Sequence, residues 1–161
     1  MGSSTPHEAK ARSRAPAGGS VVRAQPDRVL SELRTRFPGA TAIASAAKDI
    51  VGNFALQGCT DPRDLAAVDI AVVRASLGVA ETGAVWLCDA DLPHRVLPFL
   101  CQHLAVVLDA KAIVATMHEA YRRVEMSGFG SFVAGPSKTA DIEQCLVVGA
   151  QGARSFTVFV A

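Results

Sequence analysis

The sequence predicts an α/β fold, a layered sandwich in which helices flank a mostly parallel β-sheet. Two observations predict it. Segments of strand length alternate along the chain with segments of helical periodicity, and this alternation is typical of parallel sheets. The strand segments are also nearly continuous in Val, Leu, Ile and Ala, as expected for strands that are covered on both faces.

The helices are predicted from their end signals and their apolar spacing. Pro26 suits the first turn of a helix, Val29 and Leu33 share one face, and Pro38 follows the end. Further along, Thr116 and Glu119 form a capping box. Helices are therefore predicted over Pro26–Phe37 and Thr116–Glu125, with a short one near Asp61–Pro62 and another near Thr139–Val147.

The strands are predicted from the apolar runs between these helices. Residues 45–60 fit a loose helix or a strand equally well, and that segment stays unassigned. The predicted strands are Thr41–Ala44, Val68–Arg74, Gly83–Asp89, His103–Asp109, one through Phe132 and Val133, and Ser155–Val160.

The length of 161 residues predicts a single domain over residues 25–161. Residues 1–24 are rich in Ser, Pro, Ala, Gly and Arg without apolar periodicity, so they predict a flexible N-terminal tail. A formal net charge of +1 gives no bulk attraction to nucleic acid. No apolar run reaches the roughly 20 residues that span a bilayer, and no secretory signal begins the sequence, so membrane insertion is not expected and a cytoplasmic location is.

Four cysteines are present, and they are widely spaced without a C-x-x-C pair: Cys59, Cys88, Cys101 and Cys145. We expect reduced thiols that pack as small hydrophobic groups. Because chelation needs clustered ligands, no iron–sulfur or zinc site built by this chain alone is expected, and no metal ligands are assigned.

The first segment that could carry chemistry is Ala80-Glu81-Thr82-Gly83-Ala84, which lies between two apolar stretches. A carboxylate entering a buried sheet is partly desolvated, which raises its pKa and suits proton transfer or nucleophilic attack. The alternative is an ordinary turn, in which Gly83 supplies backbone freedom and Glu81 points into water. Spacing alone favours the turn.

The second such segment runs from Gly135 to Glu143, GPSKTADIE. A strand followed by Gly-Pro and then by a helix that Ser137 or Thr139 can cap would present backbone N–H groups to an anion, and Lys138 adds a positive charge. The acidic residues Asp141 and Glu143 would oppose a highly charged phosphate. Helix capping alone explains the segment equally well.

Taken together, the two segments resemble the lactate-utilisation protein C (LUD domain) family. The nine residues GPSKTADIE match that family's pattern throughout, VAETGAVWL resembles its A-E-T-G segment, and PHRVLPFLCQHLAVV resembles the L-P-x-x-H stretch that follows. The resemblance covers roughly residues 65–161. Gln151 stands where the family usually has His, and Ala153 where it has Pro, and Gln does not titrate near neutral pH.

The resemblance implies a fold like that of the NagB/RpiA/CoA-transferase group. It also implies a subunit that supports oxidation of L-lactate to pyruvate with partner proteins that carry iron–sulfur clusters, and it implies no cofactor in this chain. Two other functions stay open: a stand-alone enzyme of the isomerase, CoA-transferase or formyltetrahydrofolate cyclo-ligase kind, and a metabolite-sensing module. A homo-oligomer is also open, because the short N-terminal third leaves apolar surface for a second copy.

Our hypothesis for the site is one pocket formed by both segments and occupied by a small carboxylate or an anionic cofactor. Glu81 or Asp141 is the acid–base candidate. His103 begins an apolar strand, where a histidine is usually a core residue, and the resemblance offers the pocket as the alternative. The predicted ligand-binding residues are Thr82, Gly83, Gly135, Pro136, Ser137, Lys138, Thr139, Glu143 and His103.

Overall fold

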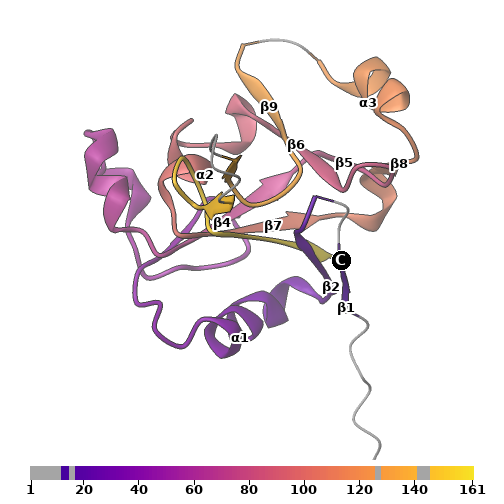
Figure 1. The fold of residues 1–161 in the computed structure, drawn as a ribbon. Coiled ribbons are helices and arrows are strands. Elements are labelled where there is room, and N and C mark those ends of the chain that lie inside the picture. Colours follow the sequence, from indigo (N-terminus) through magenta and orange to yellow (C-terminus); the bar gives the residue numbers. More distant parts are fainter. Residues whose placement is uncertain (1–11, 15–16, 126–127, 141–145) are drawn as a thin grey trace, which may run out of the picture.

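A computed structural model of the chain describes residues 12–14, 17–125, 128–140 and 146–161 (Figure 1). None of the helices in these ranges has the length and hydropathy needed to cross a bilayer. The helices are α1 (Pro26–Arg36), α2 (Leu97–Leu100) and α3 (Met117–Arg123), and the 3-10 turns are η1 (Leu56–Gly58), η2 (Pro62–Ala67), η3 (Asp89–Asp91) and η4 (Ala110–Ala112).

The larger sheet is mostly parallel. Within the described ranges it has six strands in the order β1-β2-β12-β7-β4-β3, and β1 is antiparallel to β2 while the other neighbours run parallel. The last strand of the chain thus lies between β2 and β7. The strands are β1 (Arg12–Arg14), β2 (Ser20–Arg23), β3 (Ile43–Ser45), β4 (Ile70–Ala75), β7 (His103–Leu108) and β12 (Ser155–Val160).

Helix α1 covers one face of this sheet, and it lies below the sheet in Figure 1. Pro26 occupies its first turn, and its buried residues Val29 and Leu33 pack against Ile70 and Val107 of the sheet. Burying two such side chains contributes about 3–6 kcal/mol. The alternate residues of the same strands point to the other face, which is why the central strands are apolar throughout.

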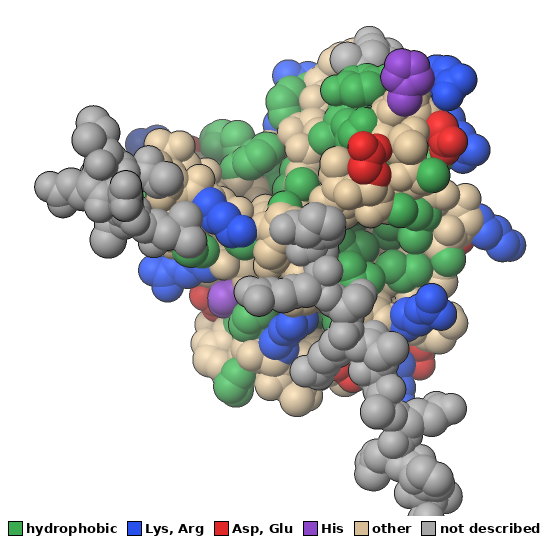
Figure 2. Space-filling model, turned by 45° about the vertical axis from the view of Figure 1, so that its right-hand side comes forward, with side chains coloured by type: hydrophobic (Ala, Val, Ile, Leu, Met, Phe, Trp, Pro, Cys, Tyr) green, Lys and Arg blue, Asp and Glu red, His purple; other side chains and the backbone are tan. Residues whose placement is uncertain are grey.

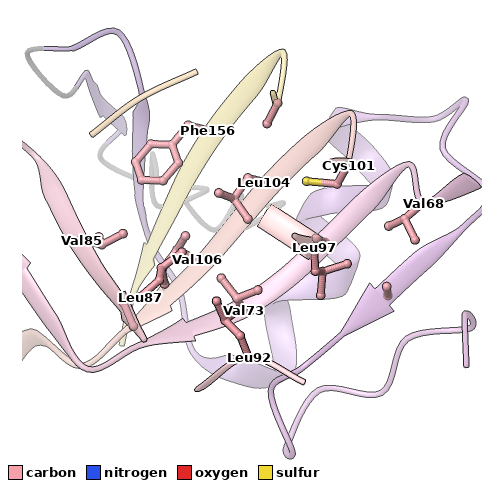
Figure 3. Close-up of a cluster of buried hydrophobic side chains, with 14 of the residues drawn as sticks. Val68, Val73, Val85, Leu87, Leu92, Leu97, Cys101, Leu104, Val106 and Phe156 are labelled. Carbon is pink, nitrogen blue, oxygen red and sulfur yellow. The ribbon is translucent and has the colours of Figure 1, made fainter. Parts of the chain in front are cut away.

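A second sheet and short helices cover the opposite face. This sheet has the order β8-β5-β6-β9, and β6 packs Val85 and Leu87 against Val73 and Val106 of the larger sheet, as Figure 3 shows. The other side of β6 carries Trp86, which packs in the cluster that α3 covers. The strands are β5 (Leu77–Val79), β6 (Ala84–Cys88), β8 (Ile113–Val114) and β9 (Gly130–Val133).

The predicted fold class is confirmed: a mostly parallel sheet lies in a layered α/β structure with helices on its outside. The predicted helix from Pro26 and the capped helix after Thr116 are present. Among the described side chains on the face in Figure 2, acidic and basic groups are interspersed rather than gathered by sign.

Two local predictions are wrong. Residues 12–14 and 20–23, assigned to a flexible tail, form β1 and β2, because the pair Val21-Val22 can extend the sheet beside β12 and bury Val22. The helix near Thr139–Val147 is replaced, where the chain is described, by an antiparallel pair of strands, β10 (Lys138–Ala140) and β11 (Leu146–Val148). The β-branched pair Val147-Val148 suits a strand better than a helix.

Candidate functional site

The ladder between β6 and β9 brings the end of the first predicted segment and the beginning of the second to the same end of the second sheet. Val85 lies opposite Val133 in this antiparallel pair. Gly83 is two residues before Val85 and Gly135 is two residues after Val133, so both glycines lie beyond the same end of the ladder. The side chains near each glycine have separate partners, however.

Glu81 caps a helix. Its Oε2 atom accepts a hydrogen bond from the backbone N–H of Met117, the first residue of α3, at 3.0 Å, and its side chain is exposed. Thr116 Oγ1 accepts from Glu119 N at 3.3 Å at the same helix end. This is the turn that the spacing favours over a desolvated carboxylate, because it places Glu81 in water beside a helix N-terminus, where negative charge is favourable.

The remainder of this turn has the geometry that the alternative interpretation predicts. Gly83 has φ = 68°, in the region where side chains are strained. Thr82 is half-buried, and its Oγ1 accepts from Ala84 N at 3.2 Å. These contacts make the E-T-G sequence a structural turn that joins β5 to β6 and stabilises α3.

The segment Gly135–Thr139 packs between the two ends of the described chain. A Cβ at Gly135 would lie 2.7 Å from the carbonyl oxygen of Ala17. Lys138 Nζ donates to that same oxygen at 2.6 Å, and Ser137 N donates to Ala153 O at 2.8 Å. Both Ser137 and Pro136 are half-buried, whereas Thr139 is exposed on β10. The segment is thus anchored by both chain ends.

The predicted anion site at a helix N-terminus loses its physical basis at this position. Lys138 and Thr139 belong to a β-strand, so no helix begins there to aim its N–H groups at a ligand. Asp141 and Glu143 lie outside the described residues. The described part of this candidate site therefore consists of the polar side chains of Ser137, Lys138 and Thr139, with no helix N-terminus beside them.

His103 lies at the first position of β7 and is half-buried. Its ring stacks on Phe37 with the centroids 3.8 Å apart and the planes inclined by 17°. Its Nδ1 atom lies 2.9 Å from Ser155 Oγ. Burial lowers the pKa of His103, an effect that Asp69 partly offsets and Arg154 reinforces. These contacts pack His103 at the start of the central strand β7 against Phe37 at the end of α1.

Residues 45–57 and 89–93 form an open cavity of about 740 Å³ that was not predicted from the sequence. It lies where the chain leaves β3, which runs parallel to β4. In open α/β sheets, ligands bind beyond the carboxyl ends of parallel strands. The segment 45–57 has no apolar periodicity, but its position directly after a predicted strand was a usable signal.

Close backbone contacts shape the wall of this cavity. A Cβ at Gly52 would overlap the carbonyl oxygen of Ile43, so only glycine fits there. Asn53 Oδ1 accepts from Ile43 N at 2.7 Å, and Asn53 Nδ2 donates to Thr41 O at 2.7 Å. The turn that follows β3 is therefore held by both the strand and the residues before it.

The charged groups near the cavity are mostly paired. Asp89 receives two hydrogen bonds of 2.7 Å from Arg95, which lower the pKa of its carboxyl group. Asp91 accepts a hydrogen bond from the Cys88 thiol at 3.1 Å, and burial together with this bond raises the pKa of Cys88. Lys48 differs, because it forms no ion pair or hydrogen bond with any residue in the described ranges.

Three of the cysteines are free thiols: Cys59, Cys88 and Cys101, of which Cys101 is buried. Burial raises the pKa of Cys101 to about 12, so its thiol packs as a hydrophobic group, as predicted. Cys145 lies outside the described residues. Among the residues that the structure describes, no three His, Cys, Asp or Glu side chains are grouped closely enough for a metal ion.

Comparison with known proteins identifies related sequences and a related fold. The sequence model of the LUD domain family matches residues 58–161. Lactate utilization protein C of Shouchella clausii (strain KSM-K16) is 31% identical over an alignment of 91 residues, and the match covers 52% of this chain and 40% of that protein. The chain therefore aligns with less than half the length of this curated relative.

A solved structure has a similar fold. The crystal structure of a DUF162 family protein from Deinococcus radiodurans superposes with a TM-score of 0.61, and the alignment covers 87% of this chain and 86% of that one. The two sequences are 15% identical. At this identity the likeness concerns the arrangement of the layers.

Proposed function

This chain belongs to the LUD domain family, and on that premise we propose that it is a lactate-utilisation protein C-like subunit in the oxidation of L-lactate to pyruvate. That oxidation removes two electrons and two protons from each lactate. In our proposal the electrons pass to iron–sulfur clusters on partner subunits in the cytoplasm. The observation that carries the proposal is the 31% identity with a lactate utilization protein C.

Exposed apolar side chains next to the second segment support a role that depends on partner subunits. Phe99, Leu100, Val147 and Val148 have exposed fractions of 40, 37, 45 and 44%, and we name them the apolar patch. Gly152 brings the loop before β12 close to both α2 and the second segment, because a Cβ there would lie 3.9 Å from Phe99 O and 3.3 Å from Ser137 Cβ. Exposed apolar groups are typical of protein interfaces.

We further propose that the two segments form the functional surface of this subunit. The turn before β6 would contribute Glu81, Thr82 and Gly83 to this surface. The second segment would contribute Gly135 to Thr139, Asp141 and Glu143, and the start of β7 would contribute His103. The shared end of the β6–β9 ladder supports this grouping. Glu81 and Asp141 would be the acid–base groups, and Ser137, Thr139 and Lys138 would bind a small anion.

Lactate-dependent growth tests the residues. The wild-type chain and the Glu81→Ala and Asp141→Ala variants are expressed in a strain that lacks its own copy, with L-lactate as the carbon source. Loss of growth at normal protein levels is expected for both variants. Thr116→Ala is the matched control, because it removes the other cap of α3 without touching the proposed surface. Wild-type growth of both Ala variants would end the site proposal.

Co-purification tests the subunit role separately. The tagged wild-type chain should bring down partner proteins with bound iron. Phe99→Asp and Val147→Asp in the apolar patch should lower that iron, whereas Ile113→Asp, which changes an exposed residue on β8, should not. A chain that purifies alone from lactate-grown cells would contradict the role.

A second function is supported by the cavity at residues 45–57 and 89–93, since about 740 Å³ suits a small molecule. This second function is that of a stand-alone enzyme or of a metabolite sensor. Turnover of a small substrate by the purified chain alone would favour the enzyme, and a ligand-dependent rise in melting temperature without turnover would favour the sensor.

A further inference from the structure

We propose that the cavity between residues 45–57 and 89–93 is a binding site for an organic anion, a ligand with an apolar body and one anionic group that Lys48 holds. The site is separate from the two segments that carry the proposed function. It does not depend on partner subunits, so it can be tested on the purified chain.

The size and lining of the cavity indicate the apolar body. Its volume of about 740 Å³ is within the range of about 300–1,000 Å³ that small-molecule sites occupy. The lining includes Ile50, Leu56 and Leu92, whose exposed fractions are 4, 8 and 7%. These side chains belong to the hydrophobic core and anchor the lining segments. Val51 also lines the cavity and is 81% exposed, so it offers apolar surface to a ligand.

The wall of the cavity is preformed, which favours binding because little ordering is needed. Asn53 joins the segment to Ile43 and Thr41 through two hydrogen bonds of 2.7 Å. Phe54 N donates to Ile43 O at 3.0 Å, and Ala44 forms a parallel bridge with Phe54. The turn is therefore a part of the sheet edge, and a ligand would meet it in its binding shape.

The charge at one end of the wall indicates the anionic group. Lys48 lines the cavity and makes no ion pair with any described residue. Its neighbour Asp49 is neutralised by Arg74, whose guanidinium lies 2.7 Å from both carboxylate oxygens. The backbone N–H groups of Ala47 and Lys48 donate to no acceptor in the described part of the chain. An ammonium group and free N–H donors together suit a sulfonate, carboxylate or phosphate.

The opposite wall restricts the ligand to a single anionic group. Asp89 is paired with Arg95, whereas Asp91 has no cationic partner among the described residues and accepts a hydrogen bond only from the Cys88 thiol there. A second anionic group near Asp91 would be repelled. A hydroxyl or amine donor on the ligand would be favourable there.

A matched pair of fluorescent probes tests the proposal. 8-Anilino-1-naphthalenesulfonate has an apolar ring system and one sulfonate, and N-phenyl-1-naphthylamine is the same molecule without the sulfonate. Both should bind the folded wild-type chain saturably, one molecule per chain. The sulfonate should bind about fivefold more tightly, which corresponds to about 1 kcal/mol for one partly exposed charge pair.

Two variants separate the anionic group from the apolar body. Lys48→Met should weaken the sulfonate about fivefold, to the affinity of the neutral probe, and leave the neutral probe unchanged. Lys111→Met, which changes a lysine on η4 outside the cavity lining, should change neither. Ala55→Trp adds an indole to an exposed lining residue, so it should lower the binding of both probes.

Two results would overturn the inference. If Ala55→Trp leaves the binding of both probes unchanged while circular dichroism shows a native fold, the probes bind elsewhere and the cavity is not the site. If Lys48→Met weakens both probes equally, or neither, the anionic part of the proposal is wrong. Neither result would bear on lactate-dependent growth, so it would leave the proposed function standing.

Discussion

His103 makes the stability of the fold depend on pH. Its pKa is lowered in the folded chain, chiefly by burial, whereas in the unfolded chain it is near the ordinary value of about 6.5. The unfolded chain therefore binds the proton more readily. The contribution of His103 to the free energy of unfolding is largest above pH 6.5, falls as the pH drops through that value, and becomes constant below the folded pKa.

Urea denaturation at several pH values between 5 and 8 measures this dependence. His103→Gln keeps a polar partner for Ser155 and removes the titration, so part of the loss of stability below about pH 6.5 should disappear. His118→Gln is the control, because His118 is exposed on α3. An identical pH dependence in the wild type and His103→Gln would contradict the assignment.

The two caps of α3 contribute separately to stability. Thr116→Ala should lower the free energy of unfolding by about 1 kcal/mol, and Glu81→Gln by about 0.5 kcal/mol through the lost charge at the helix N-terminus. Because they cap different N–H groups, the double variant should show nearly the sum. Chemical denaturation measures all three, and no effect of Glu81→Gln would show that its contact with Met117 is not formed in solution.

Single residues also show where sequence reasoning succeeds. The capping box of Thr116 and Glu119 is local, so four residues of sequence are enough to predict it. The partner of Glu81 is 36 residues away, and only the folded sheet brings the two together. The same holds for Lys48, because nothing in the spacing of 45–57 indicates that 89–93 will form the opposite wall of a cavity.

At the level of elements, long apolar strands were predictable and short ones were not. The strands Ile70–Ala75, His103–Leu108 and Ser155–Val160 are buried on both faces, so their composition identifies them. Strands β5, β8, β10 and β11 have two or three residues each. Such short strands depend on which neighbour they meet, and that information lies far away in the sequence.

The stability of the protein should be unusually sensitive to a side chain added at Gly130 of strand β9. A Cβ there would overlap the indole ring of Trp86, which is 6% exposed in the core under α3. Gly130→Ala should therefore lower the free energy of unfolding by about 2 kcal/mol, as other overpacked sites do. Gly58→Ala is the control, because a Cβ at Gly58 would have no atom within 4 Å beyond its chain neighbours. Equal thermal stability of the two variants would contradict the packing of β9 on Trp86.

At the level of the whole molecule, the fold class follows from composition, whereas the candidate site depends on topology. Alternating helices and apolar strands indicate a layered parallel sheet in any arrangement of the strands. The order of the strands in the sheet decides which loops lie next to each other, and this order cannot be predicted from any local sequence pattern. The antiparallel ladder of β6 and β9 illustrates this, since it places Gly83 and Gly135 at one end although they are far apart in the sequence.

The N-terminal strand β2 should be needed to keep the larger sheet in solution. It covers β12, and Val22 is 2% exposed. Removing residues 1–24 would expose an edge of β12, which invites pairing between molecules. We expect this truncated chain to elute from a sizing column as concentration-dependent oligomers, whereas removal of residues 1–11 alone should leave the elution unchanged. Monomeric behaviour of the shorter chain would contradict the role of β2.

The position of β12 also constrains how the protein is made. As the ribosome releases the chain from its N-terminal end, β2 emerges early and β7 later, yet the place between them remains vacant until residues 155–160 arrive. Until then both neighbouring edges stay exposed. Assembly of the larger sheet is thereby deferred until β12 has been synthesised, and nascent chains stalled before Ser155 should depend on chaperones.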